Sequence, residues 1–89
     1  MSKWYAITRD NRKLKIKNLH FNTEHLEFSF ETKTENLSII TNPASDVVKL
    51  ELVSFFGKVK SEVYVSPDEI PTIGYSDGKL HVTGQIIPF

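Results

Sequence analysis

The clearest signal for the fold is the ten-residue segment Ile73-Gly74-Tyr75-Ser76-Asp77-Gly78-Lys79-Leu80-His81-Val82. Asp-Gly between two segments of alternating polarity is the strongest short signal for a two-residue hairpin turn. Such a turn fixes every cross-strand pair, and a slip of one residue would move the apolar side chains to the wrong face. Centred on Asp77-Gly78, it pairs Tyr75 with Leu80 and Ile73 with Val82, and it leaves Gly74, His81, Thr72 and Thr83 on the other face.

Two further two-residue turns pass the same register test. A turn at Gly57-Lys58 collects apolar residues on one face, and so does a turn at Asp10-Asn11. The sequence therefore predicts three hairpins, each with one buried face. The predicted pairs are Phe56 with Val59, Leu52 with Val63 and Leu50 with Val65 in one hairpin, and Ile7 with Leu14 and Tyr5 with Ile16 in the other.

The segments between these hairpins add three further predictions. Leu26–Thr32 and Asn36–Thr41 are predicted to form a fourth strand pair that places Phe30 near Ile39. Ser66-Pro67-Asp68-Glu69 resembles a capping box, but Pro71 stops a helix, so one short helical turn near 66–70 is expected. The apolar residues change phase near Asn18, which predicts a bulge or break there. The residues on either side are Leu14 and Ile16 at even positions, and Leu19 and Phe21 at odd positions.

The predicted fold class is all-β. At 89 residues the chain has room for one core, so residues 1–89 are expected to form a single all-β domain. Hydrophobic residues make up 39% and charged residues 25%, as in ordinary globular proteins. About eight short strands, joined mainly by hairpins, predict a small antiparallel barrel or a two-sheet sandwich, and the sequence does not choose between them.

Charge and cysteine content exclude several classes of protein. Eleven basic and eleven acidic residues cancel, yet residues 1–20 hold six basic residues against one acidic, and residues 21–46 hold one against five. The absence of cysteine excludes disulfides, thiolate metal sites and a cysteine nucleophile. No apolar run resembles a signal peptide or a membrane span, so we expect a cytoplasmic protein with no membrane partner.

Catalytic and cofactor signals are weak. The three histidines, His20, His25 and His81, lack metal-ligand spacing. Glu27 and Glu31 lie on one strand about 14 Å apart, which is too far for paired acid–base catalysis. The four glycines form no phosphate-binding loop. The sequence therefore predicts no catalytic residues, no metal site, no cofactor and no enzyme activity.

The outer face of the central hairpin predicts a protein-binding surface. Aromatic and aliphatic residues alternate there with charges, and this is the composition of a protein–protein hot spot. The chain is thus predicted to be a non-catalytic protein-binding module that occludes a partner, as small inhibitors, immunity-type proteins and phage accessory proteins do. Self-association would use the same surface. In the alternative, the C-terminal residues 84–89 cover this face within the fold. The predicted partner-binding residues are Val53, Phe55, Tyr64, Lys60 and Glu62.

A second predicted function is single-stranded nucleic-acid binding. The turn predicted at Asp10-Asn11 puts Trp4 on the face that carries Lys13, Lys15 and Lys17. Bases stack on aromatic rings while lysines neutralise phosphates, so this face has the chemistry of a single-strand binding surface. In the competing interpretation, the lysines keep an edge hairpin from pairing with other sheets.

Overall fold

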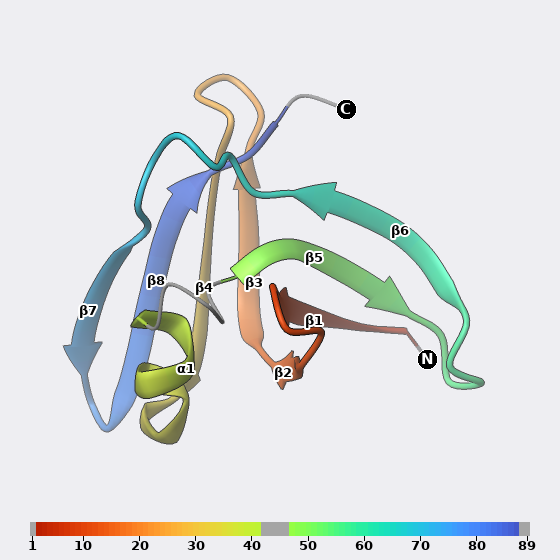
Figure 1. The fold of residues 1–89 in the computed structure, drawn as a ribbon, viewed down its shortest axis with the longest axis horizontal. Coiled ribbons are helices and arrows are strands. Elements are labelled where there is room, and N and C mark those ends of the chain that lie inside the picture. Colours follow the sequence, from red (N-terminus) through yellow and green to blue (C-terminus); the bar gives the residue numbers. More distant parts are fainter. Residues whose placement is uncertain (1, 42–46, 88–89) are drawn as a thin grey trace.

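The computed structural model describes residues 2–41 and 47–87, and in it eight strands form two antiparallel sheets. Sheet A has the strand order β2-β1-β5-β6, and sheet B has the order β3-β4-β8-β7 (Figure 1). The sheets do not close into a barrel, so the all-β prediction is confirmed in its sandwich form. The strands are β1 (Lys3–Thr8), β2 (Lys13–Lys15), β3 (Lys17–Asn22), β4 (Glu27–Lys33), β5 (Val47–Val53), β6 (Val59–Tyr64), β7 (Thr72–Ser76) and β8 (Lys79–Gln85).

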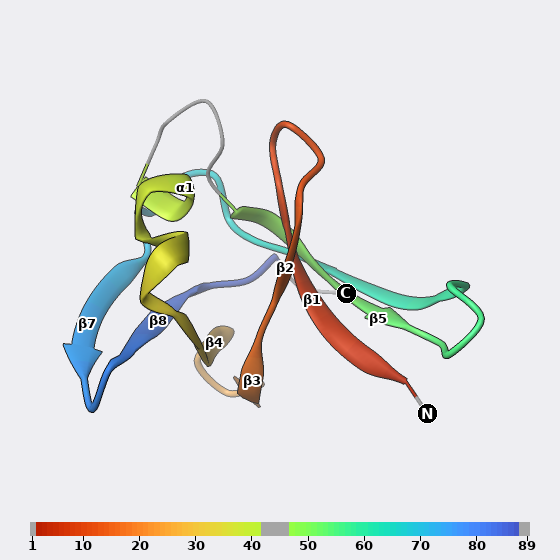
Figure 2. The same ribbon diagram turned by 90° about the horizontal axis from the view of Figure 1, so that it is seen from below.

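Sheet A consists of two hairpins side by side. Strands β1 and β5 pair antiparallel, with Thr8 opposite Val47 and Lys3 opposite Val53. Because β2 follows β1 and β6 follows β5, the two hairpin turns stand at opposite ends of the sheet. Both views of the ribbon show this arrangement, with the β5–β6 turn extending beyond the other elements (Figures 1 and 2).

The core lies between the two sheets. Ala6 and Leu50 are fully buried on sheet A, and Phe28 and Phe30 are almost fully buried on sheet B. The two phenylalanine rings stack with centroids 5.8 Å apart. Gly84 lies opposite Phe28, and a Cβ atom there would come within 2.8 Å of the ring. Glycine is therefore required at this position by close packing.

The β7–β8 hairpin has the predicted register. Its pairs are Tyr75 with Leu80 and Ile73 with Val82, as the Asp-Gly turn requires. Asp77 and Gly78 have φ angles of 53° and 75°. Positive φ at both central residues is the signature of a type I′ turn, which matches the twist of the flanking strands.

The β5–β6 register was predicted wrongly by two residues. Leu50 pairs with Val63 and Leu52 with Ser61. The turn is a three-residue loop in which Gly57, with φ of 84°, takes the left-handed position that a type I turn needs after it. Since side chains alternate with a period of two, this shift leaves the buried face unchanged.

The β1–β2 register was predicted wrongly by one residue, and this changes the faces. Ala6 pairs with Leu14 and Tyr5 with Lys15. The cause is again a three-residue loop, here with Asn11 in the left-handed conformation at φ of 67°. Trp4 and Ala6 therefore belong to the core side of sheet A, away from Lys13 and Lys15.

The predicted break near Asn18 is confirmed. Asn18 has a φ of 54°, and the β3–β4 register shifts between Lys17 and His20. At this corner the chain leaves sheet A and enters sheet B. Apolar side chains on both sides of the corner reach the core: Leu14 is buried, and Ile16, Leu19 and Phe21 pack against it.

Two predictions about local structure were wrong. The segment predicted as a strand over Asn36–Thr41 is helical, with a 3₁₀ turn η1 (Thr34–Asn36) followed by α1 (Leu37–Thr41). Strand β4 has its two neighbours in β3 and β8, so no free edge remains for this segment. Residues 66–70 form turns instead of a helix. The Ser66 amide donates to the Gln85 carbonyl at 2.8 Å, and Pro71 leaves no room for a second turn.

Candidate functional site

The β5–β6 turn presents two exposed aromatic rings. The side chains of Phe55 and Phe56, which we call the tip pair, are 79% and 91% exposed. Their rings contact each other edge to face, with centroids 5.4 Å apart. Adjacent phenylalanines exposed to this degree form a continuous apolar patch, unlike the scattered exposed residues common on protein surfaces.

The loop that carries the tip pair does not depend on it. Gly57 donates its amide to the Ser54 carbonyl at 2.9 Å, and Ser54 donates its amide to the Lys58 carbonyl at 2.8 Å. The Ser54 hydroxyl oxygen accepts a bond from the Lys58 amide at 3.1 Å. Backbone groups, one hydroxyl and one glycine thus form the turn, and the phenylalanine rings take no part in it.

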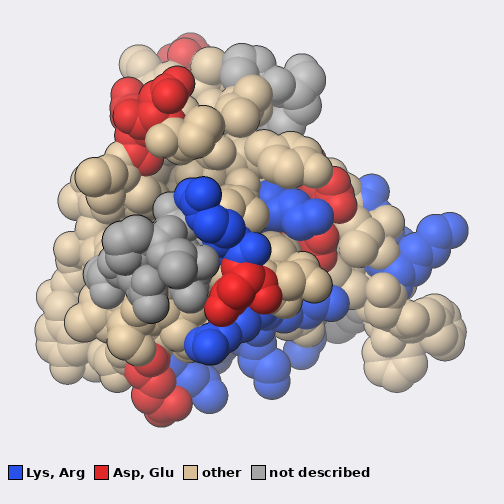
Figure 3. Space-filling view, viewed as in Figure 1, with Lys and Arg blue, Asp and Glu red and all other residues tan. Residues whose placement is uncertain are grey.

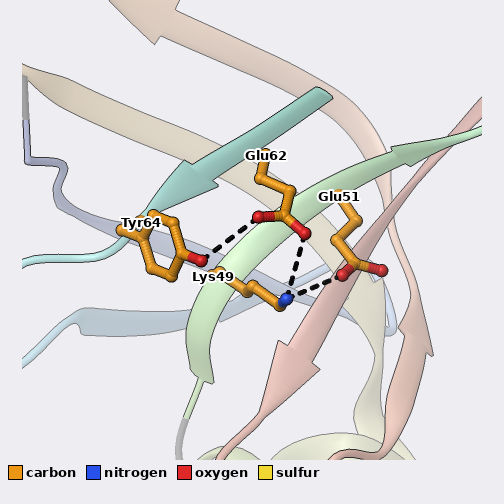
Figure 4. Close-up of polar contacts among 4 residues, drawn as sticks. All are labelled: Lys49, Glu51, Glu62 and Tyr64. Atoms are coloured by element: carbon orange, nitrogen blue, oxygen red, sulfur yellow. Dashed lines mark hydrogen bonds and ion pairs between the residues drawn. The ribbon is translucent and has the colours of Figure 1, made fainter. Parts of the chain in front are cut away.

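A polar network covers the neighbouring face of β5 and β6 (Figure 4). The Lys49 ammonium lies 2.9 Å from a Glu51 carboxylate oxygen and 3.2 Å from one of Glu62. The Tyr64 hydroxyl donates to the other Glu62 oxygen at 3.1 Å. The hydrogen bond that the Lys49 ammonium donates to Glu51, reinforced by the one to Glu62, raises the pKa of Lys49. The bonds that Lys49 and Tyr64 donate to Glu62 lower the pKa of Glu62.

The residues predicted to bind a partner separate into three groups. Phe55 lies at the hairpin tip, while Lys60, Glu62 and Tyr64 alternate along one face of β6. Val53 is buried at the irregularity between β5 and β6, so its predicted role as an exposed anchor is wrong. Phe56 was missed, because the predicted two-residue turn pointed it inward against Val59.

Residues 84–87, the described part of the C-terminal segment, dock beside β6 and leave Tyr64 half exposed. Ile86 is buried and forms a bridge with Val65. The Ile87 amide donates to the Tyr64 carbonyl at 2.9 Å, yet the Tyr64 side chain remains half exposed. Of the apolar residues at this end of the chain, Ile86 is thus buried and Ile87 is exposed, while Pro88 and Phe89 lie outside the described residues.

A groove of about 590 Å³ lies beside the β2–β3 corner. Segments at the start of β1, the end of β4 and the β7–β8 turn complete its walls. The end of β4 and the β7–β8 turn lie in the lower part of the molecule in Figure 1. The Thr32 hydroxyl ties the end of β4 to the corner by donating to the Lys15 carbonyl at 2.9 Å. Figure 3 shows Lys and Arg side chains gathered along this lower part. The groove lysines are Lys3, Lys15, Lys17, Lys33 and Lys79.

The predicted Trp4–lysine face does not exist as a sheet face, but part of it reassembles in the groove. Trp4, Lys15 and Lys17 all line the groove. Lys13 does not, and its ammonium lies 5.6 Å from the centroid of the Tyr5 ring. The observed register would keep Trp4 and Lys15 on opposite faces of a flat hairpin, but the chain bends at the β2–β3 corner and all three residues line one groove.

Within residues 2–41 and 47–87, no group of three or more histidine, aspartate or glutamate side chains could hold a metal ion. His81 lies 3.8 Å from a Glu31 carboxylate oxygen on sheet B. Among the described helices, none is long and apolar enough to cross a membrane. No protein-family model, curated protein or solved structure matches the chain.

Proposed function

We propose that the protein is a non-catalytic protein-binding module that inserts the tip pair into an apolar pocket of a partner. One observation carries the proposal. Two adjacent phenylalanines are exposed at turn positions where the backbone requires no apolar residue. The β1–β2 turn supports this directly, because the same loop holds Arg9 and Asp10 at the corresponding positions.

The tip pair has the energetic properties of a binding hot spot. Exposed rings gain free energy when they leave water, and each phenylalanine can bury an area of about 150–250 Å². The glycine-stabilised turn and the edge-to-face contact hold the rings in place, so little conformational entropy is lost on binding. A preformed aromatic wedge of this kind suits a concave partner surface.

Charged residues beside the tip would set the orientation of the partner. Lys58 and Lys60 are exposed next to the tip, and Glu62 and Tyr64 follow on β6. Such rim residues favour specificity and association rate over affinity. Filling a partner's pocket would occlude it, which is the mode of action expected of an inhibitor, immunity-type or phage accessory protein. The cytoplasmic location stays a prediction.

The test replaces the tip pair by the residues at the corresponding positions of the β1–β2 turn. The double variant Phe55→Arg/Phe56→Asp carries the residues of the β1–β2 turn and keeps the net charge unchanged. A photo-crosslinking phenylalanine analogue at position 56 should capture one discrete protein from native extract, whereas the analogue at exposed Ile70 should not. Affinity for the captured protein should fall at least about 30-fold in the double variant, as loss of a 2 kcal/mol hot spot requires.

Three results would contradict the proposal. The first is equal affinity of the double variant and the parent protein. The second is sedimentation showing that the tip pair joins two copies of this chain. The third is flotation with lipid vesicles that is lost in the double variant, since this would assign the tip to a membrane surface. Ile70→Asp controls for removal of an exposed apolar side chain elsewhere.

A further inference from the structure

The groove beside the β2–β3 corner combines an apolar floor with a basic rim. Its floor residues Trp4, Ile16 and Leu19 are half-buried and pack against the core. Five lysines and two glutamates line the rest, which gives the groove a formal charge of +3 in a protein of zero net charge. Neither the core nor the tip pair accounts for this concentration of charge.

Most of these lysines have no anionic partner among the described residues. Lys79 lies 3.6 Å from a Glu31 carboxylate oxygen. The other four groove lysines are exposed and form no ion pair within residues 2–41 and 47–87. Like charges around one groove repel one another, and an anionic occupant removes this repulsion.

We propose that the groove binds single-stranded nucleic acid, with one base against Trp4 and the adjoining phosphates on the rim lysines. Phe21 contacts Trp4 edge to face at 5.5 Å between centroids and fixes the indole at the groove floor. A fixed aromatic ring is a platform on which any base can stack. Lys15 and Lys17 stand on either side of Ile16 at the corner, where they flank the base.

The number and spread of the lysines favour a strand over other anions. They come from β1, the β2–β3 corner, the end of β4 and the start of β8, so they reach several positions along a ligand. A small carboxylate would engage one or two of them, whereas successive phosphates engage more. The volume lies within the range of about 300–1,000 Å³ that small ligands fill, so it admits an unpaired base and excludes a duplex.

The first experiment uses Trp4 as the reporter, because it is the single tryptophan of the chain. An oligothymidylate of about ten nucleotides should quench Trp4 fluorescence saturably. Affinity should fall with rising salt, with a slope of about 0.7 in log K against log salt for each phosphate neutralised. A duplex of the same length, and inorganic polyphosphate, should bind at least tenfold more weakly, since neither offers an accessible base.

Matched variants locate the site by the anisotropy of a labelled strand. Lys15→Gln with Lys17→Gln should weaken binding and lower the salt slope by about 0.7 for each contact removed. Lys13→Gln removes one positive charge from β2 at a position outside the groove, and it should leave the slope unchanged. Trp4→Leu should weaken binding about tenfold, while Trp4→Phe keeps a stacking ring.

Several outcomes would overturn the proposal. They are the absence of a Trp4 signal, equal effects of the Lys13 and Lys15/Lys17 variants, and equal binding of polyphosphate and the oligonucleotide. Tight binding of an anionic aromatic dye that the oligonucleotide fails to displace would make the groove a small-molecule site. Because this site is separate from the tip pair, the variant Phe55→Arg/Phe56→Asp should bind the strand normally, so the two proposals fail independently.

Discussion

The β1–β2 and β5–β6 turns stand at opposite ends of sheet A and use the same three-residue loop. Thr8 and Ser54 begin the two loops, and in each the side-chain oxygen accepts the amide of the residue four positions later, at 2.9 Å and 3.1 Å. Asn11 and Gly57 take the left-handed position in the two loops. The backbone is thus set by the first and last positions.

The two middle positions carry opposite chemistry. In the β1–β2 turn the Asp10 carboxylate accepts a bond from the Thr8 hydroxyl and pairs with Arg12 at 3.1 Å, so the polar tip is tied to its own loop. In the β5–β6 turn the same positions hold Phe55 and Phe56, which face solvent. The same three-residue loop can therefore serve only to connect two strands or can also present exposed side chains to a partner. The residues at its two middle positions determine which of these it does.

The largest expected effect comes from breaking the part of sheet A that the two hairpins share. Leu50 is fully buried and lies between Ala6 of β1 and Val63 of β6. Leu50→Ala should lower the free energy of unfolding by about 2–5 kcal/mol, because it removes packing and leaves a cavity. Urea denaturation measures this loss, with half-exposed Val59→Ala as the control. A loss below about 1 kcal/mol would show that the hairpins do not depend on this contact.

A smaller loss of stability is expected from substitutions at Gly57, and it should distinguish this residue from Asn11, which takes the left-handed position in the other loop. Gly57→Ala should cost about 1–2 kcal/mol, wholly from backbone conformation, since no atom lies within 4 Å of the added Cβ. Asn11→Gly should leave stability unchanged or slightly raised. Gly74→Ala adds the same methyl group to a strand, also with nothing within 4 Å, and should cost nothing. Thermal denaturation that ranks Gly74→Ala with Gly57→Ala would refute the shared loop geometry.

The smallest effect should distinguish the hairpins by pH. The pKa of Glu62, on β6, lies below its usual value of 4.5 because Lys49 and Tyr64 bind its ionised form. A lowered folded-state pKa contributes stability above pH 4.5 that is lost as pH falls through the folded value. The melting temperature should fall slightly over this acidic range, and Glu62→Gln should flatten the change. Glu69→Gln, at an exposed position outside the network, is the control. If it flattened the change as much as Glu62→Gln does, the network would play no part.

The strand register was predicted correctly where the turn residues allow only one turn type. Asp77-Gly78 permits a type I′ turn, and all pairs around it follow. The other two turns failed for a shared reason, since a left-handed Asn or Gly fits both two-residue and three-residue loops. A shift of two residues kept the β5–β6 faces correct, but a shift of one reversed those of β1–β2. The available signal was a four-residue pattern in Thr8–Asn11 and Ser54–Gly57: a hydroxyl residue, two residues of any type, and then Asn or Gly.

The candidate sites were harder to predict than the fold, for physical reasons that differ between them. A register that pairs Phe56 with Val59 predicts a buried Phe56. The side chain is exposed because the loop has three residues instead of the predicted two. The groove depends on long-range assembly, because Lys33 and Lys79 reach Trp4 only after β4 and β8 have paired. Local periodicity contains no information about such a meeting.

The place of β8 within sheet B has a consequence for protein synthesis. Strand β8 lies between β4 and β7. Its pairing with β4 places Glu27 opposite Gln85, two residues far apart in the sequence. Before β8 has been synthesised, the β3–β4 hairpin can form, but the other edge of β4 has no partner strand. Sheet B can therefore be completed only after residues 79–85 have left the exit tunnel, and until then the strand that carries Phe28 and Phe30 has an open edge.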